Sequence, residues 1–143
     1  DIEGISASLI TKMISGKFPA LPDIYFTVVD VRDIAKLHIK SLKNKESDHK
    51  RIIATSQEGI RFLEISKTLR KLGFKKSPKN LIPTQVINFL ALFNKDMRIT
   101  ASMVKRGCYG TNLSETISLY DWKPIPFEKT LEDMINSLKN IGI

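Results

Sequence analysis

The sequence predicts an α/β fold class that is mainly helical and contains a few short strands. Short runs of β-branched and aromatic residues, such as YFTVV at 25–29, are typical of strands. Longer segments repeat apolar residues every three or four positions, which is the period of an amphipathic helix. At 143 residues, the chain is expected to form a single domain over residues 1–143.

The first expected element is a helix from Ile2 to Ser15, ended by Gly16. The loop that follows, residues 17–23, contains two prolines and is expected to be ordered with low chain entropy. The helix has a broad apolar face, formed by Ile2, Ile5, Leu9, Ile10, Met13 and Ile14.

The central block, YFTVVDVRDIAKLHIK at 25–40, changes abruptly from a strand pattern to a helix pattern. We expect a short buried strand at 25–29 and a helix directly after it. Asp33 is expected to cap this helix, because a carboxylate before the first turn accepts hydrogen bonds from free backbone amides. The apolar residues of the helix then fall on one stripe: Val31, Ala35, Ile39 and Leu42.

A second short strand is expected at 51–55, because its apolar residues would suit both faces of a parallel sheet. A helix over 62–72 follows, and Gly73 ends it. Its apolar residues recur at spacings of three, four and three, which predicts that they face the core: Phe62, Ile65, Leu69 and Leu72.

Pro83 and Thr84 favour the start of another helix. Residues 86–93 are apolar except for Asn88, and a helix that is apolar on all sides is buried or contacts a partner. This segment is therefore the candidate contact for a homo-oligomer. Weaker helical patterns cover 96–106 and 112–120, and either Asn112 or Ser114 would cap the second.

The last part of the chain begins with a rigid turn, DWKPIP at 121–126. Trp122 is expected to pack as an anchor between the flanking helices. The chain then ends in a helix over 127–140, whose apolar residues lie on one face: Leu131, Met134, Ile135 and Leu138.

The block FTVVDVRDIA at 26–35, with His38 in the helix that follows, resembles a segment of the extended short-chain dehydrogenase/reductases. This is the NAD-dependent epimerase/dehydratase family, and the likeness is to its dihydroflavonol-4-reductase-like branch. Other stretches match landmarks of the second half of such enzymes in order: GKFPALP at 16–22, RIIA at 51–54, LYDWKP at 119–124 and SLKNIG at 137–142.

The resemblance implies the C-terminal, substrate-binding part of a Rossmann-type, NAD(P)-dependent oxidoreductase. Its substrate would be a carbonyl compound, either like a dihydroflavonol, aldehyde or ketone, or sugar-like. In the family the first helix borders the substrate cleft, so the pocket candidates are Ser6, Ser8, Thr11 and Lys12. Each of these could equally be a polar residue on the wet side of an amphipathic helix.

The functional signatures of the family's first half do not occur in this sequence. There is no glycine-rich G-x-x-G-x-x-G turn, and none of the three tyrosines is followed by a lysine four positions later. We therefore expect no catalytic and no cofactor-binding residue in this chain, no bound NAD or NADP, and no turnover by the chain alone. An N-terminal Rossmann half would be its partner in a longer parent protein.

Asp30, Arg32 and Asp33 are the conspicuous charges of the central block. The preferred interpretation is structural: a helix-capping carboxylate, with an Arg–Asp pair that ties strand to helix. Direct contact with a ligand is the alternative. The turn around Trp122 resembles the family's L-G-W-x-P, with Asp121 in place of the glycine and Glu115 in place of a basic residue.

The formal charge of +8 raises the alternative of a basic nucleic-acid-binding domain. The basic residues are scattered with few aromatic residues between them, so a solvated surface is the preferred interpretation. A third hypothesis is a protein-interaction module that uses residues 86–93.

The single cysteine, Cys108, excludes an internal disulfide, and His38 and His49 lie in settings that do not suggest a metal site. No apolar run could span a bilayer, so we expect a cytoplasmic protein without a membrane partner.

Overall fold

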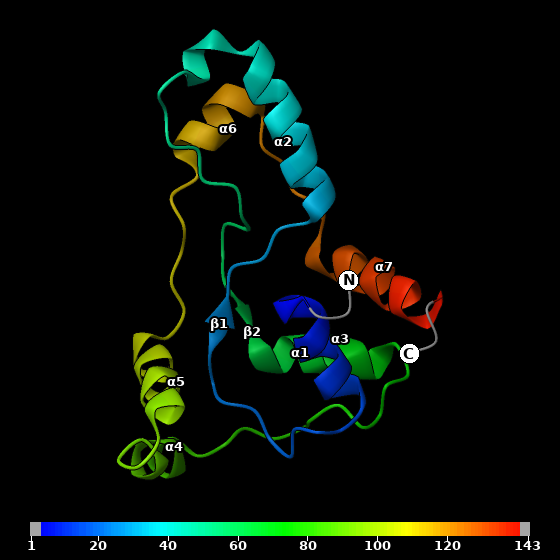
Figure 1. The fold of residues 1–143 in the computed structure, drawn as a ribbon, viewed down its shortest axis with the longest axis vertical. Coiled ribbons are helices and arrows are strands. Elements are labelled where there is room, and N and C mark those ends of the chain that lie inside the picture. The colour runs from blue at the N-terminus through cyan, green and yellow to red at the C-terminus, as the bar shows by residue number, and fades with distance from the viewer. Residues whose placement is uncertain (1–3, 141–143) are drawn as a thin grey trace.

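The computed structural model describes residues 4–140, and this part of the chain is mainly helical (Figure 1). It contains a single two-stranded antiparallel sheet, formed by β1 (Tyr25–Phe26) and β2 (Ile60–Arg61). The predicted fold class, mainly helical with a few short strands, is confirmed. The described helices are α1 (Ile5–Ile14), α2 (Val31–Lys43), the 3₁₀ turn η1 (Lys45–Ser47), α3 (Phe62–Lys71), α4 (Thr84–Leu90), α5 (Lys95–Arg106), α6 (Ser114–Tyr120) and α7 (Phe127–Asn140).

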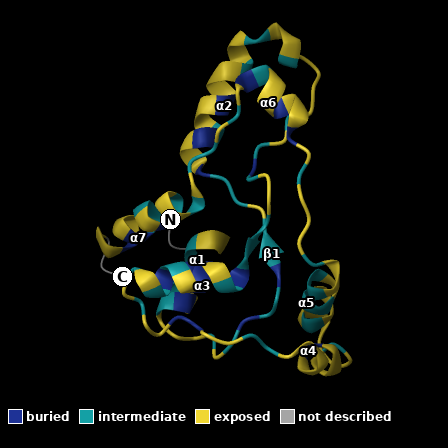
Figure 2. Ribbon diagram, turned by 180° about the vertical axis from the view of Figure 1, so that it is seen from behind, coloured by how far each residue is buried: buried dark blue, intermediate teal, exposed yellow. Residues whose placement is uncertain are grey.

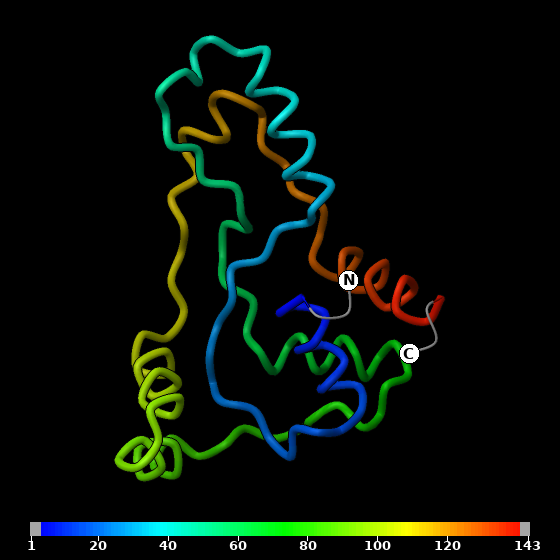
Figure 3. Tube along the Cα trace, viewed as in Figure 1, coloured from blue at the N-terminus to red at the C-terminus, as the bar shows by residue number. Residues whose placement is uncertain are grey.

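The helices form three groups joined by extended segments, as the Cα trace in Figure 3 shows. One group is α1, α3 and α7, beside the sheet. The second is α2 with α6, and the third is the pair α4 and α5 at a corner of the molecule. Two sequence-based expectations lie outside the described residues: Ile2 in the first helix, and residues 141–142 of the terminal motif.

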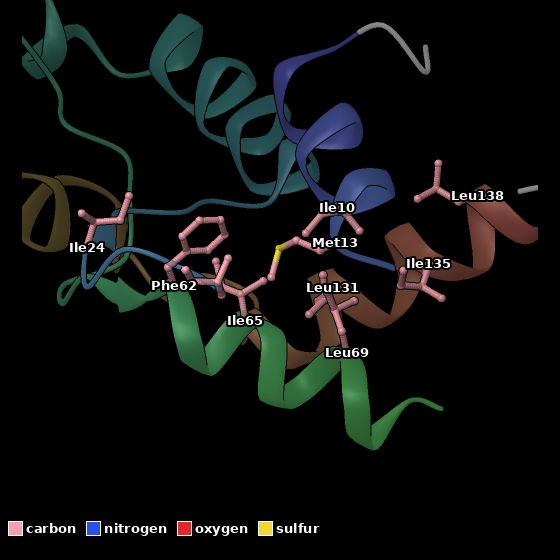
Figure 4. Close-up of a cluster of buried hydrophobic side chains, with 10 residues drawn as sticks. Ile10, Met13, Ile24, Phe62, Ile65, Leu69, Leu131, Ile135 and Leu138 are labelled. Carbon is pink, nitrogen blue, oxygen red and sulfur yellow. The ribbon is translucent and has the colours of Figure 1, made fainter. Parts of the chain in front are cut away.

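The main hydrophobic core lies between α1, α3 and α7 (Figure 4). Phe62 packs edge-on against Phe26 of β1, with ring centroids 5.2 Å apart, so the sheet is attached to the same core. The buried members of the core are Ile10, Met13, Leu21, Ile24, Phe62, Ile65, Leu69, Leu131, Ile135 and Leu138. The predicted core faces of α3 and α7 are therefore largely confirmed, with Leu72 and Met134 half-buried at the edge of the core.

The second predicted strand, at 51–55, is wrong. The partner of β1 is instead β2, which pairs antiparallel with Tyr25 opposite Arg61 and Phe26 opposite Ile60. In residues 51–55, side chains donate hydrogen bonds to backbone carbonyl groups that would bond a neighbouring strand in a sheet. Thr116 Oγ1 donates to the Ile53 carbonyl at 2.6 Å, and Trp122 Nε1 donates to the Thr55 carbonyl at 3.1 Å.

The strand predicted at 25–29 is shorter than expected, because only Tyr25 and Phe26 belong to the ladder. Beyond them, Ser56 holds Val28 from both sides. The Ser56 amide donates to the Val28 carbonyl at 2.8 Å, and the Ser56 hydroxyl accepts from the Val28 amide at 3.2 Å. The Thr55 hydroxyl also donates to the Val28 carbonyl, at 3.4 Å, so Val28 is bonded by two consecutive residues outside a regular ladder.

The prediction that Asp33 caps α2 is wrong. The cap is Asp30, whose carboxylate accepts from the Arg32 amide at 2.8 Å. The apolar stripe of α2 exists but faces solvent, since Val31 is 79% exposed and Leu42 is 88% exposed. The buried side of α2 is formed by Asp33 and Leu37 instead. Helical periodicity shows which residues share a face, but it does not show which face is covered.

The apolar segment 86–93 is mostly exposed. α4 ends at Leu90 and residues 91–93 form a turn, and only Ile87 in this segment is buried. Figure 2 shows the exposed colour over most of α4.

α5 matches its prediction to within one residue, and Asn94 caps it through the Asp96 and Met97 amides. At α6, Leu113 is at the cap position, and the Asn112 side chain accepts from the Ser114 amide.

Within the described part of the chain, none of the helices combines the length and the apolar character that crossing a bilayer requires.

Two leucines test the assignment of buried and exposed faces. Leu69→Ala should lower the free energy of unfolding by about 2–5 kcal/mol, because the side chain is fully buried in the core and a cavity would remain. Leu42→Ala should change it by less than about 0.5 kcal/mol, because that side chain is exposed. Urea denaturation of both variants measures the difference. Equal losses would contradict the solvent-facing orientation of the α2 stripe.

The backbone at Asp121 is left-handed, with φ +48° and ψ +54°, directly after α6. Glycine adopts this conformation without strain, whereas a side chain with a Cβ does not. Glycine would therefore be the least strained residue at this position. Asp is among the residues that tolerate the left-handed region best, which accounts for its presence here.

We expect Asp121→Gly to keep or raise the stability of the protein, and Asp121→Val to lower it by about 1–2 kcal/mol. Both substitutions also remove the Asp121–Lys123 ion pair, which is exposed and contributes little. Lys123→Ala is the control for that pair. Thermal denaturation of the three variants checks the order, and a valine variant as stable as the glycine variant would contradict it.

Candidate functional site

A cavity of about 240 Å³ lies between α1, the extended residues after β1, and α7. Its wall is continuous with the main core, because Ile10, Ile65 and Leu131 belong to both. Its rim reaches solvent at Ile5, which is 88% exposed. The lining residues are Ile5, Ser6, Leu9, Ile10, Phe26, Thr27, Val28, Val29, Ile65, Phe127, Thr130, Leu131 and Met134.

The lining of this cavity is apolar apart from three hydroxyl side chains, those of Ser6, Thr27 and Thr130. Within residues 4–140, none of the side chains that line the cavity is ionisable. A site of this kind can bind an apolar molecule and orient one of its polar atoms through a hydroxyl. The described lining residues include no side chain that could act as a general acid or base at neutral pH.

Of the four predicted pocket residues, only Ser6 lines the cavity. Ser8, Thr11 and Lys12 lie on the same helix but are not part of its wall. Sequence reasoning missed the contribution of α7. The signal was present, because Phe127, Thr130, Leu131 and Met134 occupy positions i, i+3, i+4 and i+7 of one helix.

Asp30 joins α2 to α7 beneath this cavity. Its Oδ1 accepts from the Arg32 Nε at 2.9 Å and its Oδ2 accepts from the Arg32 Nη2 at 2.7 Å, a bidentate ion pair. The same Oδ2 accepts from the Thr130 hydroxyl at 2.8 Å. Arg32 also bonds Asp133 at 2.8 Å, so two residues of α7 are held by the start of α2. This network sets the position of the α7 wall.

Asp33 makes a separate contact with the segment before α7. Its buried carboxylate accepts from the Ile125 amide at 2.6 Å, and Lys36 lies 3.7 Å from its other oxygen. All three charges of the central block therefore have partners within the protein. Their structural interpretation explains the contacts, although the role of the helix cap belongs to Asp30.

The ion pairs change the pKa values of the acidic groups in this network. The guanidinium of Arg32 and its hydrogen bonds hold the pKa of Asp30 well below its usual range, despite burial, which acts in the opposite direction. The same contacts raise the pKa of Arg32. Lys129 and Arg32 together lower the pKa of Asp133. These carboxylates are therefore ionised at neutral pH and are unsuited to proton transfer.

Trp122 lies in the connection between α6 and α7, closer to α6 than Ile125, and is itself held by hydrogen bonding. Its indole nitrogen bonds the Thr55 carbonyl, and the ring lies beside Leu37 and Tyr120 at a small polar hollow of about 110 Å³. Tyr120 is in turn bound to α2, because Ser41 donates to its hydroxyl and Lys40 donates to its carbonyl. The described contacts of Trp122 are with residue Thr55 and with the hollow beside α2 and Tyr120, and its packing between both flanking helices stays a prediction.

No known protein-family profile matches this chain, and no curated protein sequence matches it at a significant level.

Asp30→Asn should lower the free energy of unfolding at neutral pH by about 1–3 kcal/mol, because it weakens hydrogen bonds made to a charged group. The pKa of Asp30 is lower in the folded than in the unfolded protein. Its stabilising contribution is therefore complete above the unfolded pKa of about 4, and is lost as the pH falls toward the folded pKa. Stability of the parent chain should approach that of Asp30→Asn on acidification.

Urea denaturation at neutral pH and at a series of acidic pH values measures this convergence. Asp48→Asn is the matched control, because Asp48 is an exposed carboxylate in the turn after α2. That variant should remain as stable as the parent chain at each pH. A gap between Asp30→Asn and the parent that stays constant down to about pH 2 would contradict the linkage argument.

Proposed function

We propose that this chain is the substrate-binding part of an NAD(P)-dependent oxidoreductase that reduces a carbonyl compound. The observation that carries the proposal is the apolar cavity bordered by the first helix, which is the element that borders the substrate cleft in the similar extended short-chain dehydrogenase/reductases. The central block FTVVDVRDIA, which carries the resemblance, supplies both the cavity wall at Val28 and Val29 and the Asp30 network beneath it.

The lining of the cavity favours an apolar ketone or aldehyde over a sugar-like substrate. A sugar presents many hydroxyl groups, and each one buried without a hydrogen-bond partner is costly. Among the described residues, the side-chain hydrogen-bonding groups that the cavity offers are the hydroxyl groups of Ser6, Thr27 and Thr130, and Thr130 already donates to Asp30. An apolar compound with a single carbonyl oxygen needs only one donor, which Ser6 or Thr27 can supply.

The exposed stripe of α2 supports the need for a further polypeptide. Val31, Ile39 and Leu42 are large apolar side chains on one helical face, and all three are exposed. A contiguous apolar face of this kind is typical of a contact with another protein surface. In the proposal, a dinucleotide-binding Rossmann part covers this face and brings the coenzyme to the cavity.

The division of chemistry follows from the residues present. Hydride comes from NADH or NADPH held by the other part, which also supplies the proton donor. The present chain binds the carbonyl compound, excludes water from it through the apolar wall, and orients its oxygen. The 143 residues contain no glycine-rich phosphate-binding turn, so we expect neither turnover nor tight coenzyme binding by the chain alone.

Ligand-observed NMR with two probes tests the proposed substrate class. Acetophenone, an apolar aromatic ketone, should bind to the purified chain, and UDP-glucose should not. Ser6→Phe should weaken acetophenone binding by more than about tenfold, because the new ring would occupy the mouth of the cavity. Ser6 is exposed, so its replacement should leave the fold intact.

Lys12→Phe is the matched control, because Lys12 is an exposed residue of the same helix that does not line the cavity. It should bind acetophenone as the parent chain does. Binding of UDP-glucose without acetophenone would contradict the apolar substrate class. Reduction of acetophenone by the chain with NADH or NADPH would contradict the assignment of a binding role alone.

A further inference from the structure

The α4–α5 hairpin, residues 84–106, presents a group of exposed apolar side chains that the proposed function does not use. Phe89 is 61% exposed, Leu92 is 72% exposed and Phe93 is 77% exposed. Phe89 and Phe93 pack edge-on with ring centroids 5.6 Å apart, so they form one aromatic surface. The exposed large apolar residues of the hairpin are Val86, Phe89, Leu90, Leu92, Phe93 and Ile99.

The hairpin is held to the rest of the protein by its other side. Ile87 is buried, and Met103 and Val104 of α5 pack against the main core. The hairpin lies at a corner of the molecule, away from α2 and α6 (Figures 1 and 2). The hairpin therefore packs against the protein through one side and exposes its apolar residues to solvent on the other.

The same hairpin also carries basic residues. Lys95, Arg98 and Arg106 line one shallow hollow on α5 together with the exposed Ile99. The hairpin contains four basic residues and one acidic residue, Asp96, so its formal charge is 4 − 1 = +3. Exposed aromatic and aliphatic side chains beside lysine and arginine are the combination that binds the surface of an anionic bilayer.

We propose that the α4–α5 hairpin docks on the surface of a membrane that contains anionic lipids. Phe89, Leu92 and Phe93 enter the interface between headgroups and acyl chains, and the cations of α5 bind the lipid phosphates. A second copy of the chain is a poorer partner for the same surface, because it would bring two positively charged hairpins together. The expectation of no membrane partner considered only spanning segments, and surface docking needs none.

Vesicle flotation tests the proposal with the complete 143-residue chain. The chain should float with phosphatidylcholine vesicles that contain phosphatidylserine, and not with phosphatidylcholine alone. Phe89→Ser/Phe93→Ser should lower the partition coefficient by more than about tenfold, because it removes the inserted rings. Lys95→Glu/Arg98→Glu should lower it by a similar factor, because it reverses the attraction to the lipid surface.

Ile39→Ser/Leu42→Ser is the matched control, because it removes two exposed apolar side chains from α2 and leaves the hairpin unchanged. It should float as the parent chain does, and circular dichroism should show that all variants keep their helices. The proposal is overturned if the parent chain does not bind anionic vesicles, or if the phenylalanine variant binds them equally well. It is also overturned if the α2 variant loses binding to the same extent, or if sedimentation shows a dimer that the phenylalanine substitutions dissociate while vesicles remain unbound.

Discussion

The Asp30 carboxylate is the point on which the arrangement of the central block depends. It begins α2 by accepting from a backbone amide, holds Arg32 in a bidentate pair, and accepts from Thr130 of α7, 100 residues further along the chain. A single buried anion thus connects the end of an extended segment, the start of one helix and the side of another. A buried charge is costly unless it is fully paired. The need to pair the Asp30 carboxylate therefore holds the Arg32 amide, the Arg32 side chain and Thr130 in place together.

The candidate site follows from this connection. Residues 26–29 lead directly into Asp30, and α7 is fixed by Thr130 and Asp133, so the two walls of the cavity are set relative to one another. Charged side chains lie beneath and beside the cavity, where they pair with each other, and apolar side chains face its interior. Because the charged side chains pair with one another and the apolar side chains line the cavity, a charged central block can border an apolar binding site.

Two apolar surfaces remain uncovered in the described chain, and they differ in their surroundings. The stripe of α2 starts beside the Asp30 network that also supports the cavity, which makes it the surface that the proposed function assigns to a dinucleotide-binding part. The α4–α5 hairpin lies at a distant corner. Its formal charge of +3 equals that of α2, where four basic residues outweigh Asp33, and the hairpin differs by presenting two exposed aromatic rings, Phe89 and Phe93. Its composition suits a lipid surface better than a neighbouring protein core.

The sequence by itself determined the mainly helical class, the core faces of α3 and α7, and the positions of nearly all helices. These properties depend on local spacing and on residues such as Gly73 and Pro83, which act on their own neighbourhood. Only the tertiary structure decided that Asp30 rather than Asp33 is the cap, that 51–55 is not a strand, and that the α2 stripe faces solvent. It also decided that Ser6 lines the cavity while Ser8, Thr11 and Lys12 do not. Each of these depends on which distant group approaches, and local periodicity contains no information about that approach.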